Sequence, residues 1–291
     1  MAAAYRADTT AGKVNLSIGA YRCEEGMPYV FPVVRQAERE LLEMNLDKEY
    51  QPIDGNQEFL RGARGVLLGW DHEDVNSGRI VSAQTLSGTG AIRVICAFLK
   101  KARPDAAMYV SKPTWANHVP VMTEAGLETR EYRYFDTETR GLNIEGMLAD
   151  LENATPGSTV LLHTCAHNPT GVDPSMEEWK RIADVCEKRQ LFPFFDTAYQ
   201  GFVSGDLDKD GAALRYFIQR GFEMVSAQSF SKIMGLYGER VGAAHFVLND
   251  MTLANNVREQ VKFIIRTIHT CAPHHGGRVA AAILNNDEKR S

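Results

Sequence analysis

The feature that most constrains the fold is an alternation of helical stretches with short apolar runs of strand length. Apolar side chains recur at helical spacing over residues 32–43, 91–101 and 175–189. Apolar runs of strand length cover residues 108–111, 159–163, 191–195, 224–228 and 242–248. This alternation is typical of an α/β protein in which helices connect parallel strands. The sequence therefore predicts a mainly parallel central sheet with helices on both faces.

Two of the helices carry further local signals. On the first, Val33, Val34, Ala37, Leu41 and Leu42 share one face, which we expect to be buried. The helix at 175–189 follows a proline at position 174 and has acidic residues at 177 and 178, where the helix dipole favours negative charge.

Polar side chains follow three of the predicted strands directly. The run 159–163 leads to Asn168, the run 191–195 leads to Asp196 and Tyr199, and the run 224–228 leads to Ser229 and Lys232. In open α/β sheets, ligands bind beyond the carboxyl ends of the strands. We therefore expect an amide, a carboxylate with a phenol, and a lysine flanked by hydroxyls to converge on one site.

The residue types in this group indicate a particular chemistry. Lysine becomes an imine-forming nucleophile when burial or a nearby cation lowers its pKa, and Arg240 would be such a cation for Lys232. Asp196 follows an apolar run, where a carboxylate is costly to bury unless it meets a cation such as a pyridinium nitrogen. Taken singly, Lys232 could be a solvated surface lysine, Asp196 a turn or capping residue, and Tyr199 a packing residue.

A glycine-rich stretch, SGTG at 87–90, precedes the helix predicted from residue 91. Glycines allow close backbone approach, and a helix N-terminus attracts anions. The stretch is neither a nucleotide P-loop nor a complete dinucleotide fingerprint, because Arg93 stands where the third glycine would be. A single phosphate therefore suits it better than a pyrophosphate. Trp115 follows another strand and offers either a stacking surface for a planar ring or core packing.

Composition excludes several classes of function. A net charge of −5 disfavours nucleic-acid binding, and no run approaches the roughly 20 apolar residues of a membrane span. Five scattered cysteines and an N-terminus without an apolar signal core favour a reducing compartment, so we expect a cytoplasmic protein, with mitochondria also open. His163, Cys165 and His167 lack an evident fourth ligand, so no metal is expected.

Together these motifs resemble the aspartate aminotransferase family, which belongs to fold type I of the pyridoxal-phosphate enzymes. The matching stretches are VNLSIGAYR at 14–22, EYQPIDG at 49–55, SGTGA at 87–91, PTW at 113–115, AHNPTG at 166–171, FFDTAYQG at 194–201, QSFSK at 228–232 and GLYGERVG at 235–242. They run in order along nearly the whole chain, and their combination is highly specific.

The resemblance implies a role for each matching residue. Lys232 would form the imine with pyridoxal phosphate and then carry a proton as acid and base. Asp196 would pair with the pyridine nitrogen, supported by His118, while Asn168 and Tyr199 would bind the phenolic oxygen. The phosphate would be held by Ser87, Gly88, Thr89, Ser229 and Arg240. Trp115 would stack on the ring, and Tyr50 would reach the phosphate across a dimer interface. The substrate would be contacted by Gly19, Trp115, Asn168 and Arg266.

The resemblance also implies an organisation and an activity. Residues 1–27 would be a remnant of a small domain and residues 28–291 a cofactor-binding large domain, with the small domain incomplete and no matching arginine for the substrate α-carboxylate. The implied activity is transamination between aspartate or glutamate and 2-oxoglutarate or oxaloacetate by a homodimer. The alternatives are a non-catalytic cofactor-binding fragment or interaction module, and another imine-forming enzyme such as a decarboxylase or an aldolase.

Overall fold

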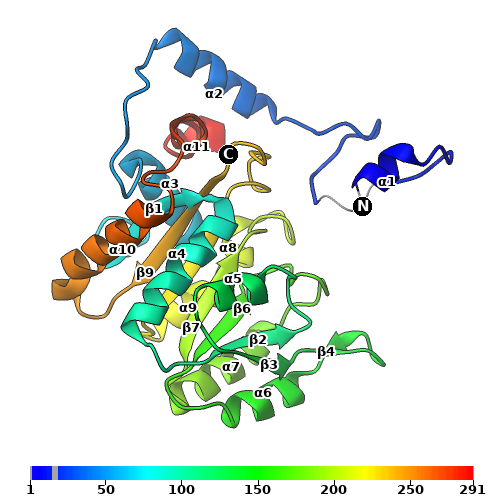
Figure 1. The fold of residues 1–291 in the computed structure, drawn as a ribbon, viewed down its shortest axis with the longest axis vertical. Helices are drawn as coiled ribbons and strands as arrows, with labels where there is room; N and C mark the ends of the chain where they lie inside the picture. Colours follow the sequence, from blue (N-terminus) through cyan, green and yellow to red (C-terminus); the bar gives the residue numbers. More distant parts are fainter. Residues whose placement is uncertain (1, 15–18, 291) are drawn as a thin grey trace.

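The computed structural model describes residues 2–14 and 19–290. Within these ranges the chain forms a twisted central sheet flanked by helices (Figure 1). Residues 15–18, which form part of the family-like stretch at 14–22, lie outside the described residues.

The central sheet has seven strands in the order β1-β9-β8-β7-β6-β2-β3. Its strands are β1 (Ile80–Leu86), β2 (Met108–Lys112), β3 (Thr129–Arg133), β6 (Thr159–His163), β7 (Phe192–Thr197), β8 (Met224–Ser229) and β9 (Val241–Val247). The neighbouring strands β3, β2, β6, β7 and β8 pair in parallel, whereas β9 runs antiparallel to both β8 and β1. The short strands β4 (Phe135–Asp136) and β5 (Gly141–Leu142) form a separate antiparallel pair. The predicted mainly parallel sheet is confirmed.

Helices precede, connect and follow these strands. They are α1 (Ala2–Ala7), α2 (Pro32–Glu43), α3 (Gln57–Leu68), α4 (Ser87–Ala102), α5 (His118–Glu124), α6 (Ile144–Glu152), α7 (Met176–Lys188), α8 (Leu207–Asp210), α9 (Ala212–Gln219), α10 (Ala254–Ile268), α11 (His274–Leu284) and α12 (Asp287–Arg290), with 3₁₀ turns at Glu73–Val75 and Met251–Leu253. No helix in the described ranges has both the length and the apolar character needed to cross a membrane.

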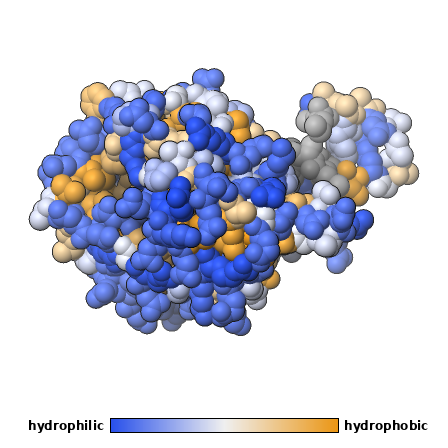
Figure 2. All heavy atoms as spheres, turned by 90° about the horizontal axis from the view of Figure 1, so that it is seen from below, coloured by the Kyte–Doolittle hydropathy of each residue, from blue (hydrophilic) through white to orange (hydrophobic). Residues whose placement is uncertain are grey.

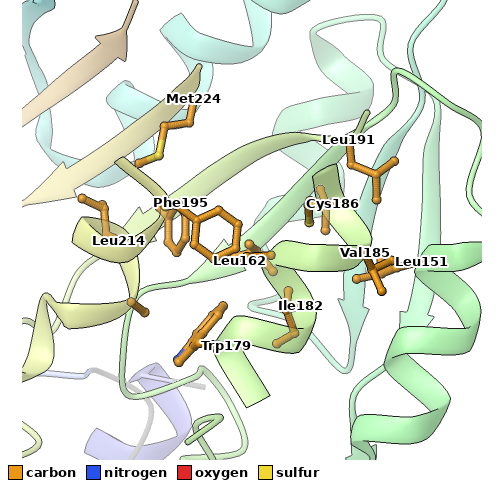
Figure 3. Close-up of a cluster of buried hydrophobic side chains, with 14 of the residues drawn as sticks. Leu151, Leu162, Trp179, Ile182, Val185, Cys186, Leu191, Phe195, Leu214 and Met224 are labelled. Carbon is orange, nitrogen blue, oxygen red and sulfur yellow. The ribbon is translucent and has the colours of Figure 1, made fainter. Parts of the chain in front are cut away.

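The two faces of the sheet bury two separate apolar clusters, because successive side chains of a strand point to opposite faces. Leu161 and Phe194 pack on the side of α4, α5 and α10. Their neighbours Leu162 and Phe195 point the other way, into a cluster with Trp179 of α7 (Figure 3). Helices therefore cover both faces of the sheet, as expected.

A third cluster lies where α2, α3 and α11 meet at the end of the sheet. Val34 and Ala37 of α2 are buried there, but Leu42 is 81% exposed, so the prediction that Leu42 belongs to the buried face is wrong. Leu41 packs against this cluster, whereas Leu42 lies about 100° further around the helix and faces solvent. The segment that includes α1 stands apart from the main body, whose visible surface in Figure 2 is mainly hydrophilic.

The helix ends agree with local sequence signals in most places. The helix predicted at 32–43 has those bounds, and Ser175 caps α7 through a capping box with Glu178. The helix predicted from residue 91 begins earlier, at Ser87, because the glycine-rich stretch itself forms the first turn of α4. This shift places the N-terminus of α4 directly after the end of β1.

Candidate functional site

Three neighbouring strands deliver the polar residues to one edge of the sheet. In the parallel register, His163 of β6 lies opposite Asp196 of β7, and Thr197 of β7 lies opposite Gln228 of β8. The residues that follow these strands therefore emerge side by side. They surround a cavity of about 250 Å³ that is lined by Gly19, Ser87, Gly88, Thr89, Ile92, Trp115, His163, Cys165, Asn168, Asp196, Ala198, Tyr199, Ser229, Ser231, Lys232, Tyr237 and Arg240.

Most of the site residues expected from the sequence meet at this cavity. Of those singled out above, His118 lies behind the cavity wall, and Tyr50 and Arg266 lie elsewhere; all the others line the cavity. Lys232 and Asp196 therefore face the same space, which the imine-forming reading requires.

Asp196 is a carboxylate held in its ionised form by a buried histidine. The Nε2 atom of His118 lies 3.0 Å from Oδ2 of Asp196, and the His118 side chain is fully buried. Burial alone would raise the pKa of Asp196. The hydrogen bond from His118, together with the positive charge of Lys232, outweighs that effect and keeps the pKa below its ordinary value. A cationic ring nitrogen in the cavity would meet a negative partner.

His118 is itself oriented by a second contact. Its Nδ1 atom lies 2.7 Å from the hydroxyl of Thr114, so both ring nitrogens are engaged. The ring also packs edge-on against Trp115, with centroids 5.2 Å apart. His118 thus fixes the carboxylate of Asp196 without reaching the cavity.

His163 adds a neutral ring to the cavity wall. Its Nδ1 atom accepts a hydrogen bond from the backbone N–H of Asn168, which leaves the proton on Nε2. Nε2 is buried and has no hydrogen-bond partner among the described residues. Burial lowers the pKa of His163 to about 4, so the ring is neutral at physiological pH. It offers one unused donor at the cavity.

Lys232 is a partly buried amine whose charge is disfavoured. Burial is the main cause that lowers its pKa, and the positive charge of Arg240 acts in the same direction, while Asp196 partly opposes them. Its Nζ atom lies 5.3 Å from the centroid of the Tyr199 ring. A lysine with a lowered pKa can attack a carbonyl carbon more readily than a solvated one.

Tyr199 faces Asn168 across the cavity. Burial is the main cause that raises the pKa of Tyr199, and the Asp196 charge adds to it, while a hydrogen bond with Asn168 partly offsets both. The phenol therefore stays protonated and can donate to an anionic oxygen.

A cluster of hydroxyls and one guanidinium forms the opposite end of the cavity, at the N-terminus of α4. The Ser87 hydroxyl lies 2.7 Å from that of Ser231 and 3.1 Å from that of Ser229. Arg240 donates to Ser231 at 3.3 Å and is held by the backbone oxygen of Tyr237 at 3.0 Å. Donors at a helix N-terminus together with an arginine favour an anion with several oxygens, such as a phosphate group.

Gly88 permits the close approach that this cluster requires. A Cβ atom at position 88 would lie 3.1 Å from Cβ of Ser229, tighter than most side-chain contacts. The absence of a side chain there keeps the first turn of α4 open toward the cavity.

Tyr50 and Arg266 lie outside this cavity. They line a second, more open cavity of about 630 Å³ with Gln51, Ile53, Thr270 and Cys271. Tyr50 is 82% exposed. Within one chain, neither residue reaches the ligand cavity.

Sequence reasoning missed several contributors to the cavity. The sequence suggests His163 only as a possible metal ligand, and Ser231 and Tyr237 lie within the family-like motifs without predicted roles of their own. The adjacency of Ser231 to Lys232, in the same turn as Ser229, was the available signal for it. Among the described residues, the one group of three potential metal ligands within 4.8 Å is His118, His163 and Asp196, which differs from the trio considered from sequence. The hydrogen bond between His118 and Asp196 accounts for their proximity.

The arrangement fits pyridoxal phosphate. The hydroxyl and arginine cluster would hold the phosphate, Lys232 would face the carbonyl carbon, and Asp196 would face the ring nitrogen. The unpartnered Nε2 of His163 and the phenol of Tyr199 leave donors for the remaining polar groups.

Comparison with known proteins places these features in a family. The model of the aminotransferase class I and II family matches residues 11–291. A mitochondrial aspartate aminotransferase of Xenopus tropicalis is 47% identical over 99% of this chain, and a chloroplastic aspartate aminotransferase of Arabidopsis thaliana is 45% identical over 97% of it. The chain spans 67% and 62%, respectively, of the length of these two relatives.

Solved structures show the same fold. The broad-specificity aminotransferase from Leishmania mexicana superposes with a TM-score of 0.95 and 46% identity, over 99% of this chain and 71% of the other. An aromatic-amino-acid aminotransferase from Burkholderia pseudomallei, covalently bound to pyridoxal phosphate, superposes with a TM-score of 0.96 and 41% identity, over 99% of this chain and 72% of the other.

Proposed function

Since the chain belongs to the aminotransferase class I and II family, we propose that it is the cofactor-binding part of an aspartate aminotransferase. The reaction would move an amino group between aspartate or glutamate and the 2-oxo acids 2-oxoglutarate and oxaloacetate. One observation carries the proposal above the others: Lys232, Asp196 and the Ser87–Ser231–Arg240 cluster line one cavity.

Each side chain has a task in that reaction. Pyridoxal phosphate, when bound, supplies an electron-accepting ring that stabilises negative charge at the substrate Cα. Asp196, kept ionised by His118, would keep the ring nitrogen protonated. Lys232 would hold the cofactor covalently, and its Nζ would take up the proton from the substrate Cα and return it. A lowered pKa suits both tasks of Lys232, because the free amine is the reactive form.

The other cavity residues would position and orient the cofactor and the substrate. Trp115 offers a flat surface for the ring, and the Tyr199 hydroxyl and Asn168 amide would bind the phenolic oxygen. Ser87, Gly88, Thr89, Ser229 and Arg240 would hold the phosphate at the start of α4. Gly19 would lie near the substrate, where a side chain would take up space. His118 would act through Asp196.

We propose that residues 1–27 and 28–291 belong to a small and a large domain, respectively. The sheet and the cavity-lining residues other than Gly19 all fall in the second range. In a homodimer, Tyr50 and Arg266 would reach the partner's cavity, with Tyr50 binding its phosphate and Arg266 the side-chain carboxylate of the substrate. The exposure of Tyr50 and the open cavity beside Arg266 support this arrangement.

The dimer is tested by sedimentation of the purified protein with and without cofactor. A dimer in which Arg266→Ala weakens the use of aspartate more than that of an aromatic amino acid supports the shared site. A monomer at all protein concentrations, or equal loss for both substrates, contradicts it.

We place the protein in the cytoplasm as a proposal. Its five cysteines are all free, which suits a reducing compartment. The mitochondrial matrix is the alternative, and fractionation of cells that produce the tagged protein separates the two.

A second candidate is a non-catalytic cofactor-binding unit. Among the described residues, Arg240 is the one arginine that lines the cavity, and it faces the phosphate end. A second guanidinium for the substrate α-carboxylate is not among the lining residues of the single chain. This observation favours binding without turnover.

The experiment that separates these readings is a spectrum followed by an assay. Pyridoxal phosphate is added to the purified protein, and its absorption is recorded before and after aspartate. A bound-cofactor band that changes with aspartate, and formation of oxaloacetate with 2-oxoglutarate, support the aminotransferase. A band that aspartate leaves unchanged supports the binding unit, release of CO₂ indicates a decarboxylase, and no band rejects the cofactor.

A further inference from the structure

Gln200 is a fully buried amide directly after Tyr199. Its Nε2 atom donates to the backbone oxygen of Val66 at 2.7 Å and to that of Leu207 at 2.9 Å. The side chain therefore joins the end of α3 to the start of α8. Its task in the fold is separate from the cavity, because Gln200 is not among the cavity-lining residues.

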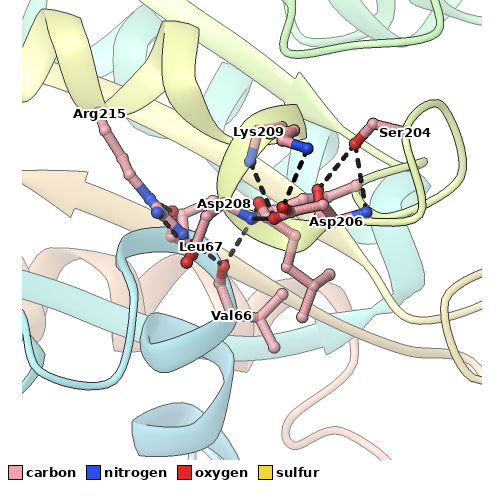
Figure 4. A network of polar contacts seen from close by, with 9 residues as sticks. Val66, Leu67, Ser204, Asp206, Asp208, Lys209 and Arg215 are labelled. Carbon is pink, nitrogen blue, oxygen red and sulfur yellow. Dashed lines mark hydrogen bonds and ion pairs between the residues drawn. The ribbon is translucent and has the colours of Figure 1, made fainter. Parts of the chain in front are cut away.

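The end of α3 is a rigid anchor for this amide. Arg215 of α9 donates to the backbone oxygen of Leu67 at 3.1 Å and also pairs with Asp208 at 2.7 Å (Figure 4). The Gln200 amide packs closely against the turn between α8 and α9, since a Cβ atom at Gly211 would lie 2.8 Å from its Nε2. On another side Gln200 borders a cavity of about 510 Å³, so its two hydrogen bonds are what hold the amide in place.

The turn that follows is clamped as well. One oxygen of the buried Asp210 accepts hydrogen bonds from the backbone N–H groups of Gly201 at 2.8 Å and Val203 at 3.0 Å. The backbone of residues 200–203 is therefore held on the side away from the cavity. On the other side, the ring of Tyr199 lies under Nζ of Lys232 and near Asn168.

We propose that Gln200 is a positioning residue that sets where the Tyr199 hydroxyl stands in the cavity. The inference rests on the proposed function, in which Tyr199 donates to the phenolic oxygen of pyridoxal phosphate. Because the two residues share a peptide bond, anchoring the Gln200 amide fixes the backbone from which Tyr199 projects. A hydrogen bond is sensitive to displacements of a few tenths of an ångström, so a loosened backbone weakens that donation.

The test is the pH at which the visible absorption of the bound cofactor changes. The pH change reports the proton on the nitrogen that joins Lys232 to the cofactor, which lies beside the phenolic oxygen. A hydrogen-bond donor on that oxygen withdraws negative charge from it, so the proton is held less tightly and leaves at lower pH. Tyr199→Phe should therefore move the midpoint upward by about 0.5–1 pH unit, the size of one ordinary hydrogen bond. Gln200→Met, which keeps the length of the side chain and removes both donated bonds, should move it in the same direction.

A double-mutant cycle shows whether the effect acts through Tyr199. In a Tyr199→Phe background, Gln200→Met should add no further shift. The matched control is Arg64→Met, which also removes a bond made by α3, the one to the backbone oxygen of Val75 at 2.8 Å, but leaves the partners of Gln200 untouched; it should leave the midpoint unchanged. Should Gln200→Met not fold, Asp210→Asn loosens the same turn and carries the same comparison.

The outcomes separate the inference from the function on which it rests. A wild-type midpoint in Gln200→Met, or an equal shift with and without the Tyr199 hydroxyl, overturns the positioning role while leaving the proposed function intact. An equal shift in Arg64→Met overturns it too. A wild-type protein without a cofactor band overturns the proposed function and the inference with it.

Discussion

Replacing Asp196 by asparagine tests the electrostatic part of the account. The substitution keeps the shape of the side chain and removes one negative charge from the cavity wall, while His118 can still donate at 3.0 Å to the remaining oxygen. The ring nitrogen of the cofactor would then lose a charge-assisted hydrogen bond, which is worth about 1.5–3 kcal/mol. Cofactor affinity should fall by about 10- to 100-fold, since each 1.4 kcal/mol is a factor of ten.

The same variant should separate attachment from turnover. Asp196 favours the charged form of Lys232, so removing it lowers the pKa of Lys232 further and leaves the amine free to react. Covalent labelling of Lys232 by borohydride reduction should therefore persist. Transamination should slow by about 10²–10³-fold, the scale seen when one preorganised electrostatic contact is lost.

Stability should change with a definite sign. The pKa of Asp196 is lower in the folded protein than its ordinary value, so the ionised carboxylate stabilises the fold at pH values above that ordinary pKa. That contribution is lost as the pH falls through the folded pKa. The destabilisation by Asp196→Asn should thus be larger at pH 7 than in acid, as measured by urea unfolding at a series of pH values.

Asp74→Asn is the matched control. Asp74 is also buried and pairs with Arg79 at 2.8 Å, but it lies outside the cavity. It should lower stability without changing cofactor affinity. Affinity and rate within twofold of wild type for Asp196→Asn, or equal losses for Asp74→Asn, would refute the electrostatic argument.

Lys232, the apolar core and a buried histidine can each be tested by one substitution. Lys232→Ala should abolish borohydride labelling and transamination while noncovalent phosphate binding partly remains, and full activity would show that the lysine is wrongly assigned. Phe195→Ala should lower the free energy of unfolding by about 3–5 kcal/mol, measured in urea, because it empties a fully buried ring site; a loss below 1 kcal/mol would contradict this packing. Burial lowers the pKa of His245 from 6.5 to about 3, so the free energy of unfolding falls as the pH drops below 6.5. Between pH 6 and 4, the free energy of unfolding of His245→Gln should fall by about 1.4 kcal/mol less per pH unit than that of the wild type. Parallel stability curves for the two proteins would contradict this prediction.

The sheet was predictable where a strand is one compact apolar run. The strand at 159–163 has the predicted bounds, and the other four predicted strands, β2, β7, β8 and β9, differ from expectation by one or two residues at one or both ends. Because parallel strands end at the same edge, the convergence of Asp196, Lys232 and Asn168 also followed from the sequence.

β1 was not predictable in the same way. Its burial pattern is almost continuous, yet it contains Ser82, Gln84 and Thr85. Ser82 is satisfied by His245 at 2.9 Å and Gln84 by the backbone of Asn56 at 3.0 Å. Partners that stand far away in the sequence make these polar side chains acceptable in a core, so no local pattern reveals the strand.

Long-range contacts also decided the finer features of the site. The neutral state of His163 depends on its burial, and its tautomer depends on the backbone N–H of Asn168. The hydroxyl cluster depends on the ends of β1 and β8, which lie on either side of β9, coming together at the start of α4. The antiparallel direction of β9 appears only in its pairing with β8 and β1, because its own composition does not reveal it. Residue types indicated the chemistry, whereas burial and register determined the protonation states.

The most direct measurement of the central claim is a crystal structure of the protein grown with pyridoxal phosphate. We expect a covalent bond to Nζ of Lys232, the ring nitrogen within hydrogen-bonding distance of Asp196, and the phosphate at the N-terminus of α4. Cofactor density at another place, or a ring whose nitrogen points away from Asp196 while Lys232 remains free, would contradict it.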